Sequence, residues 1–111
     1  MANTFKNEVY SGANTSANAN MNVYTVPAST TTVVIGLTLA NTSASAITAT
    51  VTLTNNDGDN VTLLKDAPIP TGSSLEMMSG NKIVMEASDI LKAYSSAADT
   101  LDCTLSLMEI T

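Results

Sequence analysis

Residues 47–54 read Ile47-Thr48-Ala49-Thr50-Val51-Thr52-Leu53-Thr54, with an apolar side chain at every odd position and a threonine at every even position. Successive side chains of a β-strand point to opposite faces, so this pattern predicts a strand with one face in a core. The four threonines are expected on the wet face, because β-branched side chains suit a pleated sheet surface. Residues 101–107 repeat the alternation, with Cys103 in phase with the leucines around it.

Residues 32–39 are more continuously apolar, which predicts a strand covered on both faces, either central in its sheet or against a partner. Gly36 interrupts this strand and is expected where another chain approaches closely. Asp57-Gly58, within residues 55–60, predicts a hairpin turn, since both residues tolerate a positive φ. Residues 68–72 predict a rigid bend followed by a turn, and residues 79–81 predict another turn.

The same reasoning applied along the chain predicts strands over residues 5–10, 22–26, 31–40, 46–54, 60–66, 74–78, 82–86, 90–94 and 100–109. Residues 87–98 have a helix-like spacing of apolar side chains, but their flanking turn residues favour a strand followed by a turn. The expected fold is all-β, a single antiparallel β-sandwich (jelly-roll or Ig-like) of eight or nine short strands with an N-terminal arm. Its core should contain Leu37, Val51, Leu53, Leu105 and Leu107.

The 111 residues are the size of one domain. We expect an N-terminal strand and arm over residues 1–22 and the sandwich over residues 23–111. Residues 11–20 have no large apolar side chain and cannot bury anything by themselves. Phe5, Val9 and Tyr10 precede this segment and are predicted to be assembly contacts on a neighbouring copy or a shell. The alternative is that residues 5–10 form an edge strand of their own subunit.

The composition excludes much chemistry. The chain has no histidine, arginine, glutamine or tryptophan, and it has a single cysteine, four scattered lysines and a net charge of −6. Without histidine the commonest general base and metal ligand is missing, and without clustered cations neither nucleic acid nor an anionic membrane is an expected partner. We also expect no signal peptide and no membrane span. Threonine, serine and asparagine make up over a third of the chain, a composition common where surfaces pack against identical copies.

Four features of the sequence are candidate sites. Asp57 and Asp59 could bind calcium, but the loop lacks the order of oxygen ligands of a calcium-binding EF-hand, so a plain turn is favoured. The acidic pairs Asp99/Asp102 and Glu76/Glu86 lack an aromatic platform for a sugar. Cys103 has no histidine or arginine to lower its pKa, so it is expected to be a small buried hydrophobe. Met77 and Met78 occupy both faces of one strand, and Met78 is a predicted assembly contact. We expect no enzyme activity, metal or cofactor.

Three further stretches carry a resemblance to a known family. They are residues 25–37 (Thr25-Val26-Pro27-Ala28 through Val33-Val34-Ile35-Gly36-Leu37), residues 64–75 (Leu64-Lys65-Asp66-Ala67-Pro68-Ile69-Pro70-Thr71-Gly72-Ser73-Ser74-Leu75) and residues 80–98, which begin Gly80-Asn81-Lys82-Ile83-Val84-Met85. With the leucine-rich last strand, they resemble small virion proteins of tailed bacteriophages, especially those of marine bacteria and cyanobacteria. The resemblance covers residues 23–110. It implies a non-enzymatic β-sandwich subunit that is added to heads or tails in many copies.

The leading interpretation is a capsid decoration or cement protein that binds between capsomers, with the virion as its location after assembly in the host cytoplasm. Its partners would be the major capsid protein or tail proteins, and further copies of itself in a homo-oligomer such as a trimer. A tail, neck or fibre-associated subunit is the first alternative. A cell-surface or carbohydrate-binding module is the second, although four scattered aromatic residues offer few faces for stacking sugars.

Overall fold

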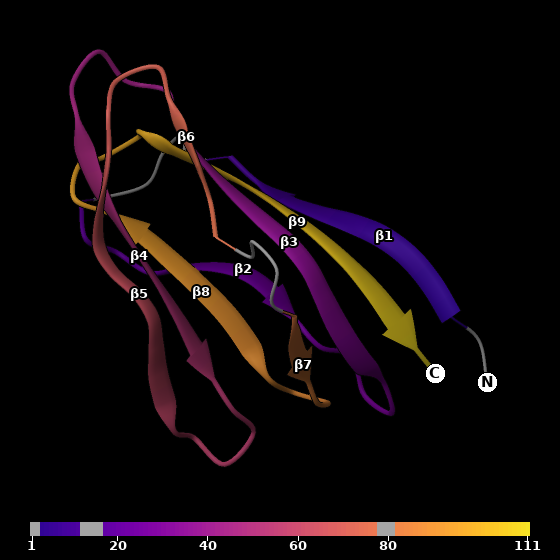
Figure 1. The fold of residues 1–111 in the computed structure, drawn as a ribbon. Coiled ribbons are helices and arrows are strands. Elements are labelled where there is room, and N and C mark those ends of the chain that lie inside the picture. Colours follow the sequence, from indigo (N-terminus) through magenta and orange to yellow (C-terminus); the bar gives the residue numbers. More distant parts are fainter. Residues whose placement is uncertain (1–2, 12–16, 78–81) are drawn as a thin grey trace.

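A computed structural model describes residues 3–11, 17–77 and 82–111. It has two antiparallel sheets that face each other, so the predicted all-β sandwich is confirmed (Figure 1). The strands are β1 (Asn3–Tyr10), β2 (Met21–Thr25), β3 (Thr31–Asn41), β4 (Ile47–Thr54), β5 (Asn60–Ile69), β6 (Ser74–Glu76), β7 (Ile83–Met85), β8 (Ile90–Ser95) and β9 (Leu101–Ile110). Residues 90–95 are a strand, as the turn residues on both sides predicted. In the described ranges, no helix is long and apolar enough to cross a membrane.

The strand order is that of a jelly roll. The five-stranded sheet has the order β1-β9-β3-β6, with β7 also paired to β3, and the four-stranded sheet has the order β2-β8-β4-β5. β6 pairs with Thr38–Ala40 and β7 with Thr32–Val34, so the two short strands share one edge of β3. Most steps along the chain cross from one sheet to the other, which distinguishes this topology from an Ig-like sandwich.

The core lies between the inner faces of the two sheets. Leu37, Val51, Leu105 and Leu107 are each at most 1% exposed, as predicted. Leu53 is half-buried and packs against this core from its margin. Cys103 is buried in phase with the leucines of β9, which confirms its predicted role as a small hydrophobe.

Two details of the alternating pattern differ from the expectation. Thr50 is only 2% exposed, although it was assigned to the wet face. Its Oγ1 accepts a hydrogen bond from the backbone N–H of Asp66 at 3.1 Å, where β4 and β5 pair with a register shift. β3 is central, but the described residues cover its outer face only in part, and Ile35 is 40% exposed. A register shift between Val34 and Gly36 changes the inward positions from even to odd numbers.

The turns of the second half follow the sequence in part. Asp57-Gly58 closes the predicted hairpin, with Thr54 opposite Asn60 and Gly58 at a φ of +92°. β5 continues through Pro68 to Ile69, where a bend was expected. Proline is tolerated there because β5 is the edge strand of its sheet and needs no partner on its outer side. The turn predicted over residues 79–81 lies outside the described residues.

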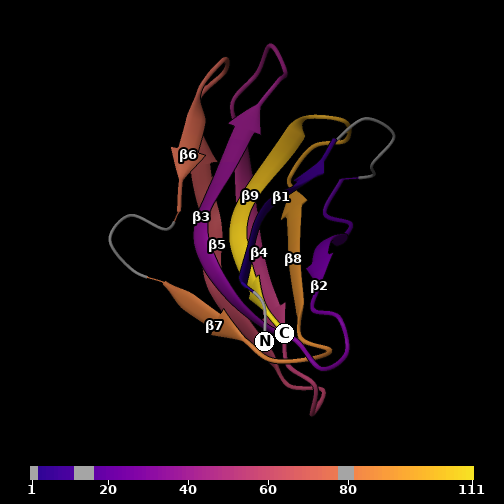
Figure 2. The ribbon, with the colours of Figure 1, turned by 90° about the vertical axis from the view of Figure 1, so that its right-hand side faces the viewer.

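The N-terminal strand belongs to the sheet of its own subunit, as the alternative interpretation had it. β1 pairs antiparallel with β9 over its whole length, from Asn3 opposite Ile110 to Tyr10 opposite Cys103. β1 is the edge strand of the five-stranded sheet, and this edge is turned toward the viewer in Figure 2. Met21, at the start of β2, is a core residue. Whether residues 1–22 also act in assembly stays a prediction.

Candidate assembly surface

An apolar row crosses the outer face of the five-stranded sheet. Phe5 of β1 lies opposite Met108 of β9, Met108 opposite Val33 of β3, and Val33 opposite Val84 of β7. Phe5 is 74% and Val84 62% exposed, whereas Val33 and Met108 are half-buried. We call these four residues the outer apolar row. They face solvent because the four-stranded sheet covers only the opposite, inner face.

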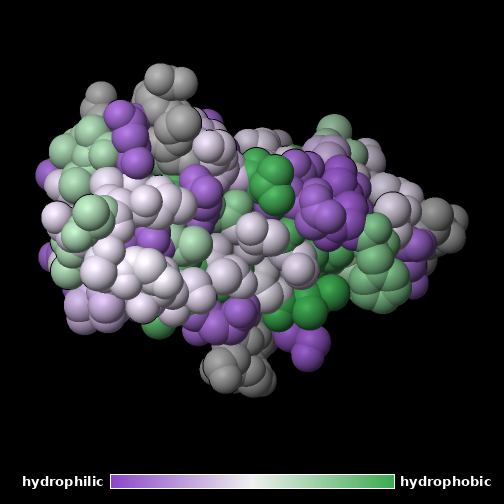
Figure 3. Space-filling model, turned by 90° about the horizontal axis from the view of Figure 1, so that it is seen from above, coloured by the Kyte–Doolittle hydropathy of each residue, from purple (hydrophilic) through white to green (hydrophobic). Residues whose placement is uncertain are grey.

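A shallow open hollow of about 320 Å³ lies beside this row. Its lining includes Phe5 on one side and Ile35 on the other, with Ser106 between them. Ser106 pairs with Asn7 of β1 and with Gly36 of β3. These three residues form a second row across the outer face, parallel to the outer apolar row and with smaller side chains. Seen from above, strongly hydrophobic groups lie in the middle and on the right of the molecule, next to hydrophilic ones (Figure 3).

Among the described residues, no close neighbour requires a glycine at position 36. A Cβ added there would meet Oε1 of Glu76 at an ordinary contact distance of 3.9 Å, and no other described atom within 4 Å. Gly36 therefore adds no side chain to the outer face, although no described neighbour comes close enough to require a glycine there. Its predicted role in assembly remains a prediction.

The other predicted contact residues lie in different places. Phe5 and Val9 (66% exposed) share the outer face with Asn7, because alternate residues of a strand point the same way. Tyr10 points to the opposite face and packs against the core cluster. Met78 lies outside the described residues. The structure thus brings Phe5, Val9 and Gly36 to one sheet face and separates Tyr10 from them.

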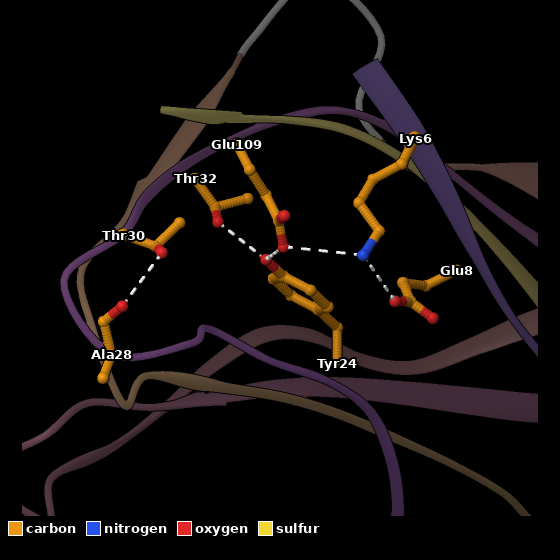
Figure 4. Close-up of polar contacts among 7 residues, drawn as sticks. All are labelled: Lys6, Glu8, Tyr24, Ala28, Thr30, Thr32 and Glu109. Atoms are coloured by element: carbon orange, nitrogen blue, oxygen red, sulfur yellow. Dashed lines mark hydrogen bonds and ion pairs between the residues drawn. The ribbon is translucent and has the colours of Figure 1, made fainter. Parts of the chain in front are cut away.

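Charged and polar side chains occupy the inner face near the ends of β1 and β9 (Figure 4). The Tyr24 hydroxyl of β2 donates a 2.5 Å hydrogen bond to Glu109 of β9 and is 2.8 Å from Oγ1 of the buried Thr32. The ammonium group of Lys6 lies 3.8 Å from Glu109 and 3.4 Å from Glu8. These contacts join β1, β2, β3 and β9 across the two sheets. Each charged side chain of this cluster has a partner of opposite charge, so no charge is buried alone.

Burial and the hydrogen bond to Glu109 raise the pKa of Tyr24 to about 12. Burial likewise raises the pKa of the Cys103 thiol to about 12. Both groups therefore stay protonated at neutral pH, and neither is an activated nucleophile. This polar cluster holds the strands together.

Sequence patterning missed the Tyr24–Glu109 contact because its partners are 85 residues apart. The available signal was the alternation of β1 itself, with Lys6 and Glu8 on one face and Phe5 and Val9 on the other. That alternation indicates a strand with a polar inner side, which can pack only over other polar groups.

The loop at residues 55–60 is organised by its own asparagine. The side-chain oxygen of Asn55 accepts hydrogen bonds from the N–H groups of Asp57 and Asp59. The buried Asp89 accepts the N–H groups of Asn56 and Glu86, which fixes the hairpin to the turn before β8. Among the described residues, no three acidic or cysteine side chains come together in a way that could hold a metal ion.

Comparison with known proteins shows a shared fold at low sequence identity. No protein-family model matches the chain, and no curated protein matches it significantly. A chain from the capsid of the Helicobacter pylori bacteriophage KHP30 matches with a TM-score of 0.55 and 12% identity, over 100% of this chain and 94% of that chain. A chain from the infectious bursal disease virus particle matches with a TM-score of 0.55 and 13% identity, but the 95% of this chain that aligns spans only 30% of that chain.

A chain from the disulfide-linked pili of Bacillus endospore appendages matches with a TM-score of 0.54 and 13% identity, over 99% of this chain and 87% of that chain. All three solved structures come from capsids, virus particles or pili. At these identities the likeness shows the fold, and the chain therefore has the jelly-roll fold found in capsid proteins.

Proposed function

We propose that this protein is a non-enzymatic structural subunit of a bacteriophage virion, a capsid decoration or cement protein that binds between capsomers. The observation that carries the proposal is the outer apolar row, with Phe5 and Val84 exposed on a sheet face that no described strand of the subunit covers. A contiguous apolar strip on a small domain is a common sign of a protein contact. The similarity of the fold to a phage capsid chain over nearly the whole of both chains supports the same role.

The docking contact would use the outer apolar row together with the hollow beside it. Small side chains at Gly36, Asn7 and Ser106 leave space for a side chain of the capsid protein between Phe5 and Ile35. With a net charge of −6 and only four lysines, the surface favours contact with protein over contact with the packaged nucleic acid. A tail or neck location would use the same surface against a different partner.

Substitutions on this face test the proposal in particles that carry the protein. Phe5→Asp and Val84→Asp should each abolish incorporation, measured as copies per particle by quantitative mass spectrometry of purified virions. Val61→Asp is the matched control, because Val61 is 51% exposed on the edge strand of the other sheet. Normal incorporation of both outer-face variants, with all variants folded, would contradict the proposed docking face.

A second variant tests the hollow by itself. Gly36→Ala should leave the melting temperature almost unchanged, since among the described residues the added methyl group meets only the Glu76 carboxylate, at 3.9 Å. It should nevertheless reduce incorporation if a partner side chain enters the hollow. An unchanged copy number would place Gly36 outside the contact.

A further inference from the structure

β1 is a long, regular edge strand of the five-stranded sheet. It runs for eight residues without proline, bulge or register shift, and β9 is the only strand of the described chain that pairs with it. The other edge strands are protected. β5 contains Pro68 and shifts of register, β2 has five residues with a shift between Asn22 and Tyr24, and β6 and β7 have three residues each. A long regular edge is a template for another strand unless something blocks it.

The side chains of β1 are complementary to a second, antiparallel copy of the same strand. If Asn7 lies opposite Asn7 of the second copy, Phe5 lies opposite Val9 and Lys6 opposite Glu8, each pair twice because of the two-fold symmetry. Paired residues of an antiparallel ladder project to the same face. The apolar pairs would therefore fall on the outer face and the ion pairs on the inner face.

Charge selects this register over its neighbours. A two-fold axis perpendicular to the sheet keeps paired side chains on the same face, so the two residue numbers of each pair are both odd or both even. The sum of these two numbers therefore changes by two from one register to the next. One of these adjacent registers places Lys6 opposite Lys6, and the other places Glu8 opposite Glu8. Like charges directly opposite each other destabilise a strand pair. Only the register centred on Asn7 combines opposite charges with a nearly full overlap of the strand.

We propose that two copies of this protein pair through their β1 strands, antiparallel and centred on Asn7, to form one continuous ten-stranded sheet across a two-fold axis. The dimer would extend each outer apolar row toward Val9 of the other copy, so that a broad apolar face is presented. The pairing concerns the isolated protein and does not depend on a virion role. A single strand pair is smaller than a standard interface of about 1,600 Å², so the dimer should be weak and populated at high protein concentration.

Disulfide trapping at the two-fold axis tests the pairing. In the Asn7→Cys variant the two introduced thiols face each other across the ladder, at a Cα separation of about 4.5–5.5 Å that permits a disulfide. Thr4→Cys is the matched control, because Thr4 is exposed on the same strand but lies about 20 Å from its own copy in this register. Cys103 is buried in all variants and does not compete.

Under mild oxidation, the Asn7→Cys protein should form a covalent dimer on a non-reducing gel, and the Thr4→Cys protein should stay monomeric. Adding Glu8→Lys to Asn7→Cys should lower the initial rate of trapping about tenfold, since two ion pairs become two repulsive pairs. Glu86→Lys is its control, with the same change of charge at an exposed site away from β1. Circular dichroism of each variant verifies that it is folded.

Two results would overturn the proposal. One is an Asn7→Cys protein that remains monomeric at high concentration while folded. The other is trapping that is equal for Asn7→Cys and Thr4→Cys, or equal with Glu8→Lys and Glu86→Lys, because random collision gives no preference for register or charge. Failure of virion incorporation with normal trapping would count against the proposed virion role alone.

Discussion

Leu105 is fully buried in the middle of β9, where it faces the four-stranded sheet. Leu105→Ala removes the buried apolar surface and leaves a cavity that the two rigid sheets cannot close. We expect the free energy of unfolding to fall by about 2–5 kcal/mol. Equilibrium urea unfolding measures the change, and Thr104→Ala, the adjacent exposed position, should stay within about 0.5 kcal/mol of the parent. A loss below about 1 kcal/mol for Leu105→Ala would show that the site is poorly packed.

Two buried side chains, the Cys103 thiol and the Tyr24 hydroxyl, should make the protein less stable at high pH. The pKa of Cys103 rises from 9.0 to about 12 by burial, and that of Tyr24 rises from 10.0 to about 12 by burial and the bond to Glu109. The folded state then holds these protons more tightly than the unfolded state. Stability from these groups is therefore complete below the unfolded pKa values and is lost as pH rises toward about 12.

Urea unfolding at several values between about pH 8 and 11 measures this loss. In the Cys103→Ala variant, the decrease in unfolding free energy that begins near pH 9 should disappear. In the Tyr24→Phe variant, the decrease that begins near pH 10 should disappear. For each variant, the slope of the unfolding free energy against pH is compared with the slope of the parent. A loss of stability that is the same at every pH does not change this slope. Slopes that equal the parent slope in both variants would refute the assignment.

The loop at residues 55–60 is expected to be a turn without a metal. Asn55 already accepts the N–H groups of Asp57 and Asp59, which fixes the loop by hydrogen bonds alone. Asp57→Asn combined with Asp59→Asn should leave the melting temperature unchanged, with or without added calcium. A calcium-dependent rise in the parent that the double variant abolishes would establish a calcium site, since a ligand of the folded state must stabilise it.

At the scale of the strands, the bulged pairing of β4 and β5 depends on Thr50. Its Oγ1 accepts the N–H of Asp66, a residue with a φ of +48° where the register shifts. Thr50→Val keeps the shape but removes the acceptor, so unfolding should require about 1–3 kcal/mol less free energy. Thr52→Val, half-buried in the same strand, is the control in the same urea titration. Equal effects of the two substitutions would show that the Asp66 bond contributes nothing.

Thr50 also shows where the sequence was sufficient and where it was not. Period-two patterning located all nine strands of the described residues, because most of them have one apolar face that meets the core. β1 also alternates, but its apolar residues Phe5 and Val9 face solvent. Patterning assigned Thr50 to solvent because the pattern does not show the register shift between β4 and β5 that brings Asp66 to the Thr50 hydroxyl. It predicted a strand covered on both faces at residues 32–39, because an apolar run does not show the bulge between Val34 and Gly36 that leaves Ile35 exposed on the outer face.

The assembly contacts were predictable to a similar extent. Phe5 and Val9 stand out in the sequence as apolar residues before a polar segment, and both prove to be exposed. The outer apolar row was not predictable, because it needs Val33, Val84 and Met108 to align across strands that are distant in sequence. Which strand neighbours which is a property of topology, and alternation does not encode it.

At the scale of the whole molecule, the jelly roll places two proposed contact surfaces side by side. The outer face of the five-stranded sheet carries the apolar row, and the β1 edge beside it carries the self-complementary strand. A subunit with one surface for the shell and another for its own copy can stabilise a shell over many symmetric contacts. We therefore expect the outer face of this sheet to be buried against a virion protein.

Electron cryo-microscopy of the intact phage particle is the decisive measurement. We expect density for the jelly roll on the capsid, with Phe5 and Val84 against the major capsid protein and the hollow beside Gly36 filled by a partner side chain. A particle that contains the protein with this sheet face open to solvent, or a purified particle that lacks the protein altogether, would contradict it.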